Sequence, residues 1–82
     1  MNSALWLENI NFINQIDYTY PLNCSVQVRH QHTPVKCQVL NENNGFSIKF
    51  SEKIRAIAPG QSAVLYNGDV CLGGGVIAKT FK

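Results

Sequence analysis

The chain has 82 residues, a formal net charge of +2 and a hydrophobic fraction of 45%. This length predicts one small domain, residues 1–82, with a modest core, and no apolar run approaches the ~18 residues of a membrane-spanning helix. The mild charge neither requires nor excludes a nucleic acid, because a local basic patch matters more than the sum. The first residues also lack the basic-then-apolar order of a secretory signal.

The first predicted strand covers residues 4–14, and its apolar positions slip out of alternation between Leu7 and Ile10. That slip indicates a bulge or a short break. A connector follows at residues 18–23, since the residue before a proline is pushed into an extended conformation. Residues 24–30 then alternate between apolar and polar side chains, which predicts a strand with one buried face.

The later strands are separated by a polar hairpin loop at residues 41–45 and by the turn dipeptide Pro59-Gly60. They are predicted at residues 35–40, 46–50, 61–66 and 69–80. About six short strands without a helix pattern are typical of an all-β sandwich or barrel. Because a small sheet must protect its edges, we expect a closed or nearly closed Greek-key β-barrel.

Four of the six glycines lie between Gly68 and Gly75. Asn67-Gly68 between two apolar runs predicts a β-hairpin with a type I′ turn at that dipeptide. The run Gly73-Gly74-Gly75 predicts a sharp bend, where the second strand of this hairpin turns a corner of the barrel. A phosphate-binding loop is the alternative, but the glycine spacings of the known phosphate loops are absent.

The three cysteines, Cys24, Cys37 and Cys71, are widely spaced and form no C-x-x-C pair. An odd number at this spacing argues against a disulfide framework and favours a reducing, cytosolic compartment. His30 and His32 with such distant thiols match a zinc site poorly, so we expect no metal. We interpret the thiols as small apolar core side chains.

The strongest candidate for a polar binding site is the cluster Arg29-His30-Gln31-His32, and Lys36 follows shortly after it in the sequence. An arginine offers a planar fork suited to phosphate, and histidines stack on or hydrogen-bond to the bases of looped RNA. The alternative is an ordinary solvated loop. Gln61 is a second candidate binding residue. The alternative is that its side-chain amide caps the turn or faces solvent. The five acidic residues are scattered, and no complete catalytic site is visible.

Residues 24–30, residues 34–37 and above all residues 58–77 (APGQSAVLYNGDVCLGGGVI) resemble the C-terminal domain of the tRNA-specific 2-thiouridylases. The resemblance runs from about Leu5 to Ile77. Full-length members of that family are cytoplasmic tRNA-uridine 2-sulfurtransferases. They activate the wobble uridine of certain tRNAs with ATP and replace its 2-oxygen with sulfur from a sulfur-relay protein. The resemblance implies a β-barrel of the kind also found in elongation factors and aminomethyltransferases.

The family's ATP-binding motif, S-G-G-V-D-S, and its two sulfur-carrying cysteines have no counterpart in this chain. The resemblance therefore implies a non-catalytic, monomeric, tRNA-contacting domain that itself holds no cofactor. The family's tRNA contacts come from an R-[YH] pair and from the glutamine of P-G-Q-S, which match Arg29, His30 and Gln61. Gln31 stands where the family often has a further arginine, so fewer phosphate contacts are implied.

Two other functions remain open from the residues alone. A barrel that only packs on neighbouring domains predicts an exposed apolar patch. A barrel that binds a small molecule predicts a deep apolar pocket. A tRNA-contacting domain predicts that Arg29, His30 and Gln61 share one basic surface.

Overall fold

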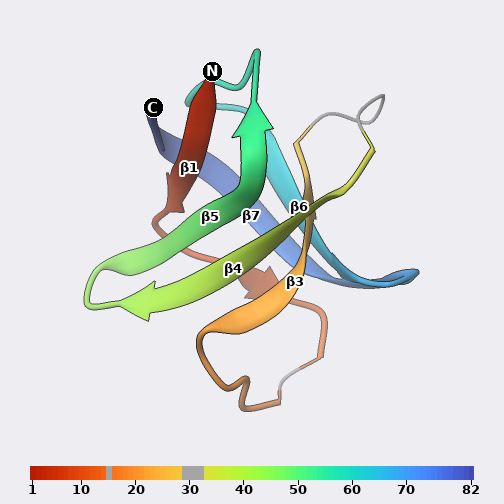
Figure 1. Cartoon of the computed structure of the whole chain (residues 1–82). Coiled ribbons are helices and arrows are strands. Elements are labelled where there is room, and N and C mark those ends of the chain that lie inside the picture. Colours follow the sequence, from red (N-terminus) through yellow and green to blue (C-terminus); the bar gives the residue numbers. More distant parts are fainter. Residues whose placement is uncertain (15, 29–32) are drawn as a thin grey trace.

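The structure, a computed structural model, describes residues 1–14, 16–28 and 33–82. Its regular elements are seven strands (Figure 1): β1 (Asn2–Leu7), β2 (Asn11–Phe12), β3 (Leu22–Gln27), β4 (Val35–Glu42), β5 (Gly45–Ile54), β6 (Ser62–Asn67) and β7 (Val70–Phe81). Across the described ranges, no helix has the length and apolar character needed to cross a membrane.

Six of the strands form a closed antiparallel barrel. They are hydrogen-bonded in the order β1-β5-β4-β3-β6-β7, and a further pairing of β1 with β7 closes the ring. β3, β4 and β5 form a meander and β6 returns to lie beside β3, which is the Greek-key arrangement. The predicted all-β Greek-key barrel is therefore confirmed. β2 is an additional short strand that pairs with β7.

Aliphatic side chains from alternate strand positions fill the interior of the barrel. The seven largest fully buried side chains are Leu5, Leu7, Ile48, Leu65, Ile77, Val26 and Val39. Each such burial stabilises the fold by about 1.5–3 kcal/mol relative to an exposed side chain. Since these side chains occupy the barrel axis, the interior is a packed core and not a ligand cavity.

The predicted first strand, residues 4–14, is two strands in the structure. β1 ends at Leu7 and β2 begins at Asn11, so the predicted break between Leu7 and Ile10 is confirmed. The two pieces differ in their partners, because β1 lies between β5 and β7 whereas β2 pairs with β7 alone. Ile10 in the break is only 6% exposed and extends the core beyond the end of β1.

The first tight hairpin has a shorter loop than predicted. Glu42 pairs with Gly45, so the predicted loop at residues 41–45 shrinks to the turn residues Asn43 and Asn44. The polar composition of this stretch predicted the turn but not its length, because β4 and β5 continue their pairing past the last buried side chains.

The second tight hairpin is displaced by one residue from the prediction. Asn67 pairs with Val70, so the two turn residues are Gly68 and Asp69 instead of Asn67-Gly68. Gly68 has a φ of 60°, and it is the only one of the two turn residues with a positive φ. That combination is characteristic of a type II′ turn, not of the predicted type I′ turn.

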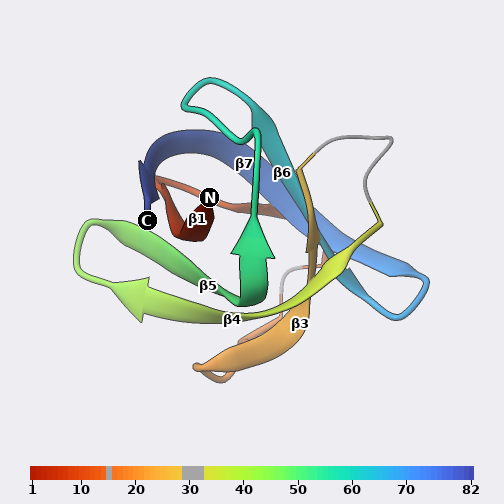
Figure 2. The same ribbon diagram turned by 45° about the horizontal axis from the view of Figure 1, so that its top comes forward.

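The glycine run turns a corner of the barrel, as predicted. β7 pairs with β6 up to Val76 and with β1 from Ile77 onward, and the strand curves around the barrel as it changes partner (Figure 2). The pairing shifts register between Leu65 and Tyr66, whose partners are Gly73 and Cys71, so Leu72 is an extra residue on β7. Gly73 has a φ of 148°, and a Cβ there would collide with the carbonyl oxygen of Asn11. The glycines therefore allow β2 to lie close against β7.

An aromatic cluster covers the core near β2 and the connector that leads to β3. The rings of Phe12 and Tyr18 stack with their centroids 4.5 Å apart, and Phe46 of β5 lies 6.4 Å from Phe12 and 6.0 Å from Tyr20. Burial raises the pKa of the Tyr20 hydroxyl. The connector, which the sequence predicted only as an extended segment, is thus held to the barrel by its tyrosines.

Candidate nucleic-acid interface

Gln61 lies in a tight turn between β5 and β6. The backbone N–H of Gln61 donates to the carbonyl oxygen of Ala58 at 3.3 Å, which closes a four-residue turn around Pro59-Gly60. Gly60 has a φ of 93°. Proline at the second position and a glycine with positive φ at the third define a type II turn. The predicted turn at Pro59-Gly60 is therefore confirmed.

The side chain of Gln61 stabilises this turn. Its Oε1 accepts a hydrogen bond from the backbone N–H of Ala58 at 2.9 Å. The turn is also anchored to β7, because Gln61 and Gly60 exchange backbone hydrogen bonds of 2.8 Å with Ile77. The turn-capping role that the sequence left open is thus present. The Nε2 amino group takes no part in the turn and is the group suited to an external acceptor.

Arg29 and His30 lie outside the described residues. The described end of β3 is nevertheless informative, because Gln27 pairs with Val64 near the start of β6. The antiparallel pairing means that the chain leaves β3 beside the segment where β6 begins, immediately after Gln61. The proximity of Arg29, His30 and Gln61 remains a prediction.

The charged side chains divide between the two ends of the barrel. β5 and β7 finish, and β1, β4 and β6 begin, at one end of the barrel, which we call the Gln61 end. Figure 1 shows both termini of the chain at this end. The exposed basic residues at the tips of these segments are Lys53, Arg55 and Lys82, with Glu52 as the acidic exception. Three further exposed lysines, Lys36, Lys49 and Lys79, lie along β4, β5 and β7 between the two ends. The opposite end comprises the two hairpin turns, the segment after β1 and the loop before β3. Its charged residues are Glu8, Asp17, Glu42 and Asp69.

This distribution gives the barrel a positive end and a negative end. A phosphate backbone is attracted to clustered lysine and arginine and is repelled by clustered carboxylates. The charge at the Gln61 end is therefore the more favourable of the two for an anionic partner. Sequence reasoning did not identify Lys53 and Arg55, although they precede the turn that holds Gln61 in the same stretch of chain, because no motif marks them as part of a site.

The structure also adds to the interpretation of two cysteines. Cys24 of β3 and Cys37 of β4 are direct cross-strand partners, and their sulfur atoms are 3.8 Å apart. Cys37 is buried and Cys24 is half-buried, as is Cys71. The interpretation of Cys24 and Cys37 as small apolar core side chains holds, since Cys37 is part of the core and Cys24 packs against it, but their direct contact was not predicted. Antiparallel pairing brought together residues whose sequence spacing suggested no relation.

We expect the replacement Gln61→Ala to lower the free energy of unfolding by about 0.5–1.5 kcal/mol, because the hydrogen bond to the Ala58 N–H is lost. The replacement Gln61→Glu retains an acceptor oxygen and should cost less. Urea denaturation followed by the fluorescence of Trp6, the single tryptophan, measures both changes. Equal stability of the alanine variant and the original chain would show that the turn does not need this side chain.

The fold and the positively charged end place the chain in the class of closed Greek-key barrel domains with one surface whose charge suits an anionic polymer. A family model described as "Aminomethyltransferase beta-barrel domain" matches residues 2–77, and the chain belongs to this family. The chain is 44% identical to tRNA-specific 2-thiouridylase MnmA of Staphylococcus saprophyticus, over 90% of this chain and 20% of that protein. It is 41% identical to the protein of the same name from Pseudomonas fluorescens, over 93% of this chain and 20% of that protein.

A third relative of that name, from Salmonella arizonae, is 36% identical over 96% of this chain and 22% of its own length. The chain thus spans about a fifth of the length of these curated relatives. The matches confirm the resemblance to the C-terminal domain of the 2-thiouridylases that residues 58–77 suggested.

Proposed function

We propose that this chain is the tRNA-contacting, non-catalytic domain of a cytoplasmic enzyme that 2-thiolates the wobble uridine of tRNA with ATP. The observation that carries the proposal is the match of nearly the whole chain to about a fifth of each 2-thiouridylase relative. ATP binding, sulfur transfer and contact with a sulfur-relay donor are assigned to the remainder of such an enzyme. The domain itself contributes as a monomer and needs no cofactor.

The Gln61 end is the proposed RNA-binding surface. Lys53 and Arg55 flank the turn and supply positive charge. Arg29 contacts a phosphate through its planar guanidinium, His30 stacks on or hydrogen-bonds to a base, and Gln61 donates from Nε2 while its Oε1 holds the turn. The negative charge at the opposite end supports this orientation, since phosphates avoid it.

A packing role is the second candidate, and exposed apolar side chains favour it. Ile13, Ile16 and Val70 are 64%, 62% and 58% exposed, and the N–H of Ile13 donates to the carbonyl oxygen of Leu72 in β7. These residues belong to the opposite end of the barrel. Exposed apolar patches mark protein contact surfaces. Met1, Val76 and Phe81 are exposed as well and lie toward the Gln61 end. The two roles are compatible, because packing at the opposite end leaves the Gln61 end accessible to RNA.

The decisive experiment replaces Arg29 by alanine in the protein that carries the remaining domains. We expect weaker tRNA binding and a salt dependence, log K against log salt, that is lower by about one, because one phosphate contact is lost. The matched control is Glu42→Ala at the opposite end, which should leave both quantities unchanged. If Arg29→Ala behaves like this control, the RNA-contact assignment is wrong and the packing role replaces it.

The two Gln61 variants separate turn stability from RNA contact. Gln61→Glu keeps the acceptor for the Ala58 N–H but removes the Nε2 donor and places a carboxylate near the RNA. We therefore expect Gln61→Glu to bind tRNA more weakly than Gln61→Ala, although it is the more stable of the two. Filter binding at several salt concentrations measures the affinities. The reverse order of affinity would mean that Gln61 acts on RNA only through the turn.

A further inference from the structure

Cys24 and Cys37 are placed as a disulfide would need them. They lie directly opposite each other on β3 and β4, and their sulfur atoms are 3.8 Å apart. Opposed residues of antiparallel strands have Cα atoms about 4.5–5.5 Å apart, which is within the range that a disulfide spans. A sulfur–sulfur bond is about 2.05 Å long, so side-chain rotation has to bring the sulfurs closer. The closed barrel already holds the two backbones in position.

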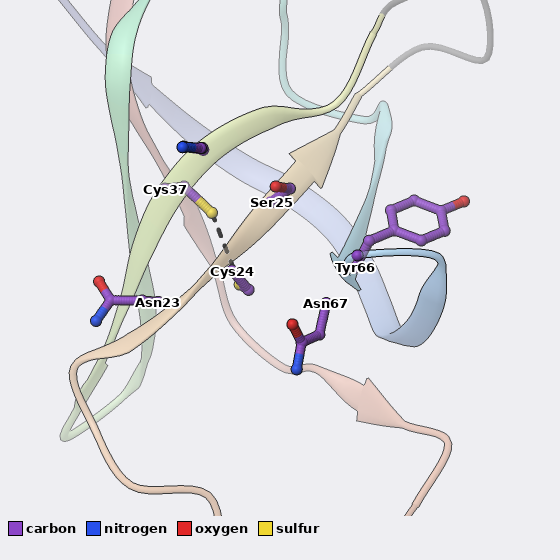
Figure 3. Close-up of a pocket in the computed structure, with 8 residues that line it drawn as sticks. Asn23, Cys24, Ser25, Cys37, Tyr66 and Asn67 are labelled. Atoms are coloured by element: carbon purple, nitrogen blue, oxygen red, sulfur yellow. Dashed lines mark hydrogen bonds between the residues drawn. The ribbon is translucent and has the colours of Figure 1, made fainter.

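The two thiols differ in access. Both cysteines line an open groove of about 290 Å³ together with Ser25, Lys36 and Tyr66, and Figure 3 shows Cys37 pointing toward Cys24 from β4. Cys24 is half-buried there. Cys37 is only 6% exposed. The two sulfur atoms share a hydrogen bond in which either can be the donor. This hydrogen bond lowers the pKa of the Cys24 thiol, whereas the same hydrogen bond and burial raise the pKa of Cys37. Cys24 is therefore the thiol that reacts first with a reagent from solvent.

We propose that Cys24 and Cys37 are a reversible dithiol–disulfide pair that a low-molecular-weight disulfide, such as oxidised glutathione, oxidises through the groove at Cys24. This inference rests on the geometry of β3 and β4 alone and is independent of the RNA-binding proposal. The same strands lead toward and away from residues 29–32, and the bond would join β3 to β4 two residue pairs before Val26–Val35, the last pair of this ladder.

The reaction proceeds by two exchanges. The Cys24 thiolate attacks one sulfur of the small disulfide, forms a mixed disulfide and releases one glutathione thiolate. Cys37 then loses its proton to water, and its sulfur attacks the Cys24 sulfur and releases the second glutathione. The protein gives up two electrons and two protons, and the small disulfide becomes two thiols. An excess of reduced thiol reverses both steps.

Mass spectrometry of the folded chain after treatment with oxidised glutathione tests the proposal. We expect a mass loss of about 2 Da, which corresponds to the two hydrogen atoms removed by thiol–disulfide exchange. Trypsin then places each cysteine in a different peptide, because Arg29, Lys36 and Arg55 separate them. The expected cross-linked product joins residues 1–29 to residues 37–49. Cys71, in residues 56–79, should remain free of this link, and dithiothreitol should restore the original mass.

Two variants make the test specific. Cys37→Ala should stop at a stable glutathione adduct on Cys24, whereas Cys71→Ser should form the 24–37 link as the original chain does. If Cys37→Ala does not fold, limiting alkylation of the original chain replaces it, and Cys24 should react about tenfold or more faster than Cys37. Persistent adducts without a link, a link to Cys71 or between molecules, or equal alkylation of Cys24 and Cys37 would overturn the proposal.

Discussion

Replacing Gly73 by alanine is expected to cost about 3–5 kcal/mol of folding free energy, a large part of the stability of a domain this small. Two effects add at this position. The φ of 148° is one that a residue with a Cβ rarely adopts, and the new methyl group would collide with the backbone of Asn11. Backbone cannot rotate away as a side chain can, so β2 would have to separate from β7. Urea denaturation of the two chains measures the cost.

Gly68→Ala is the matched control for this prediction. Gly68 also has a positive φ, 60°, but nothing lies within 4 Å of the position that a Cβ would take. Only the conformational penalty applies there, about 1–2 kcal/mol. The difference between the two variants measures the collision with Asn11 together with the larger conformational penalty of the φ of 148° at Gly73. If both substitutions cost the same, β2 does not depend on its close approach to β7 at the glycine run.

The barrel was predictable because its strands have one buried face each. Alternation in residues 24–30 and 46–50 and the glycines of β7 define strands and a corner without any tertiary information. The exact hairpin register was not predictable from these patterns. Asn67-Gly68 is a strong local turn signal, but the pairing of Asn67 with Val70 moves the turn by one residue. Cross-strand pairing overrode the local preference.

The candidate site was predictable only where a local motif defines it. Pro59-Gly60-Gln61 specifies its own turn, and the structure shows that turn closed by the Gln61 side chain. The Cys24–Cys37 contact and the positive charge from Lys53 and Arg55 could not be predicted in this way. The thiol contact arises when β3 and β4 pair, and a single sequence does not specify that pairing directly. Lys53 and Arg55 precede Gln61 in the same connection, but no local motif marks them as binding residues.

Reversing the charge at the Gln61 end should weaken tRNA binding strongly. We expect the double variant Lys53→Glu and Arg55→Glu, made in the protein that carries the remaining domains, to lose about tenfold to a hundredfold in affinity at ~0.1 M salt. Both side chains are exposed, so their replacement should leave stability nearly unchanged. The loss should shrink as salt rises, because screening reduces both the original attraction and the new repulsion.

A compensating pair of substitutions decides whether the loss of tRNA affinity comes from the position of the charges or from the total charge of the chain. Adding Glu8→Lys and Glu42→Lys at the opposite end restores the formal net charge of the chain to +2. If RNA approaches the Gln61 end, the fourfold variant stays as weak as the double variant, since the restored charges lie on the wrong side of the barrel. Recovery of affinity would instead mean that net charge attracts the tRNA. The assignment of the RNA-binding surface to the Gln61 end would then be wrong, although the family membership of the chain would stand.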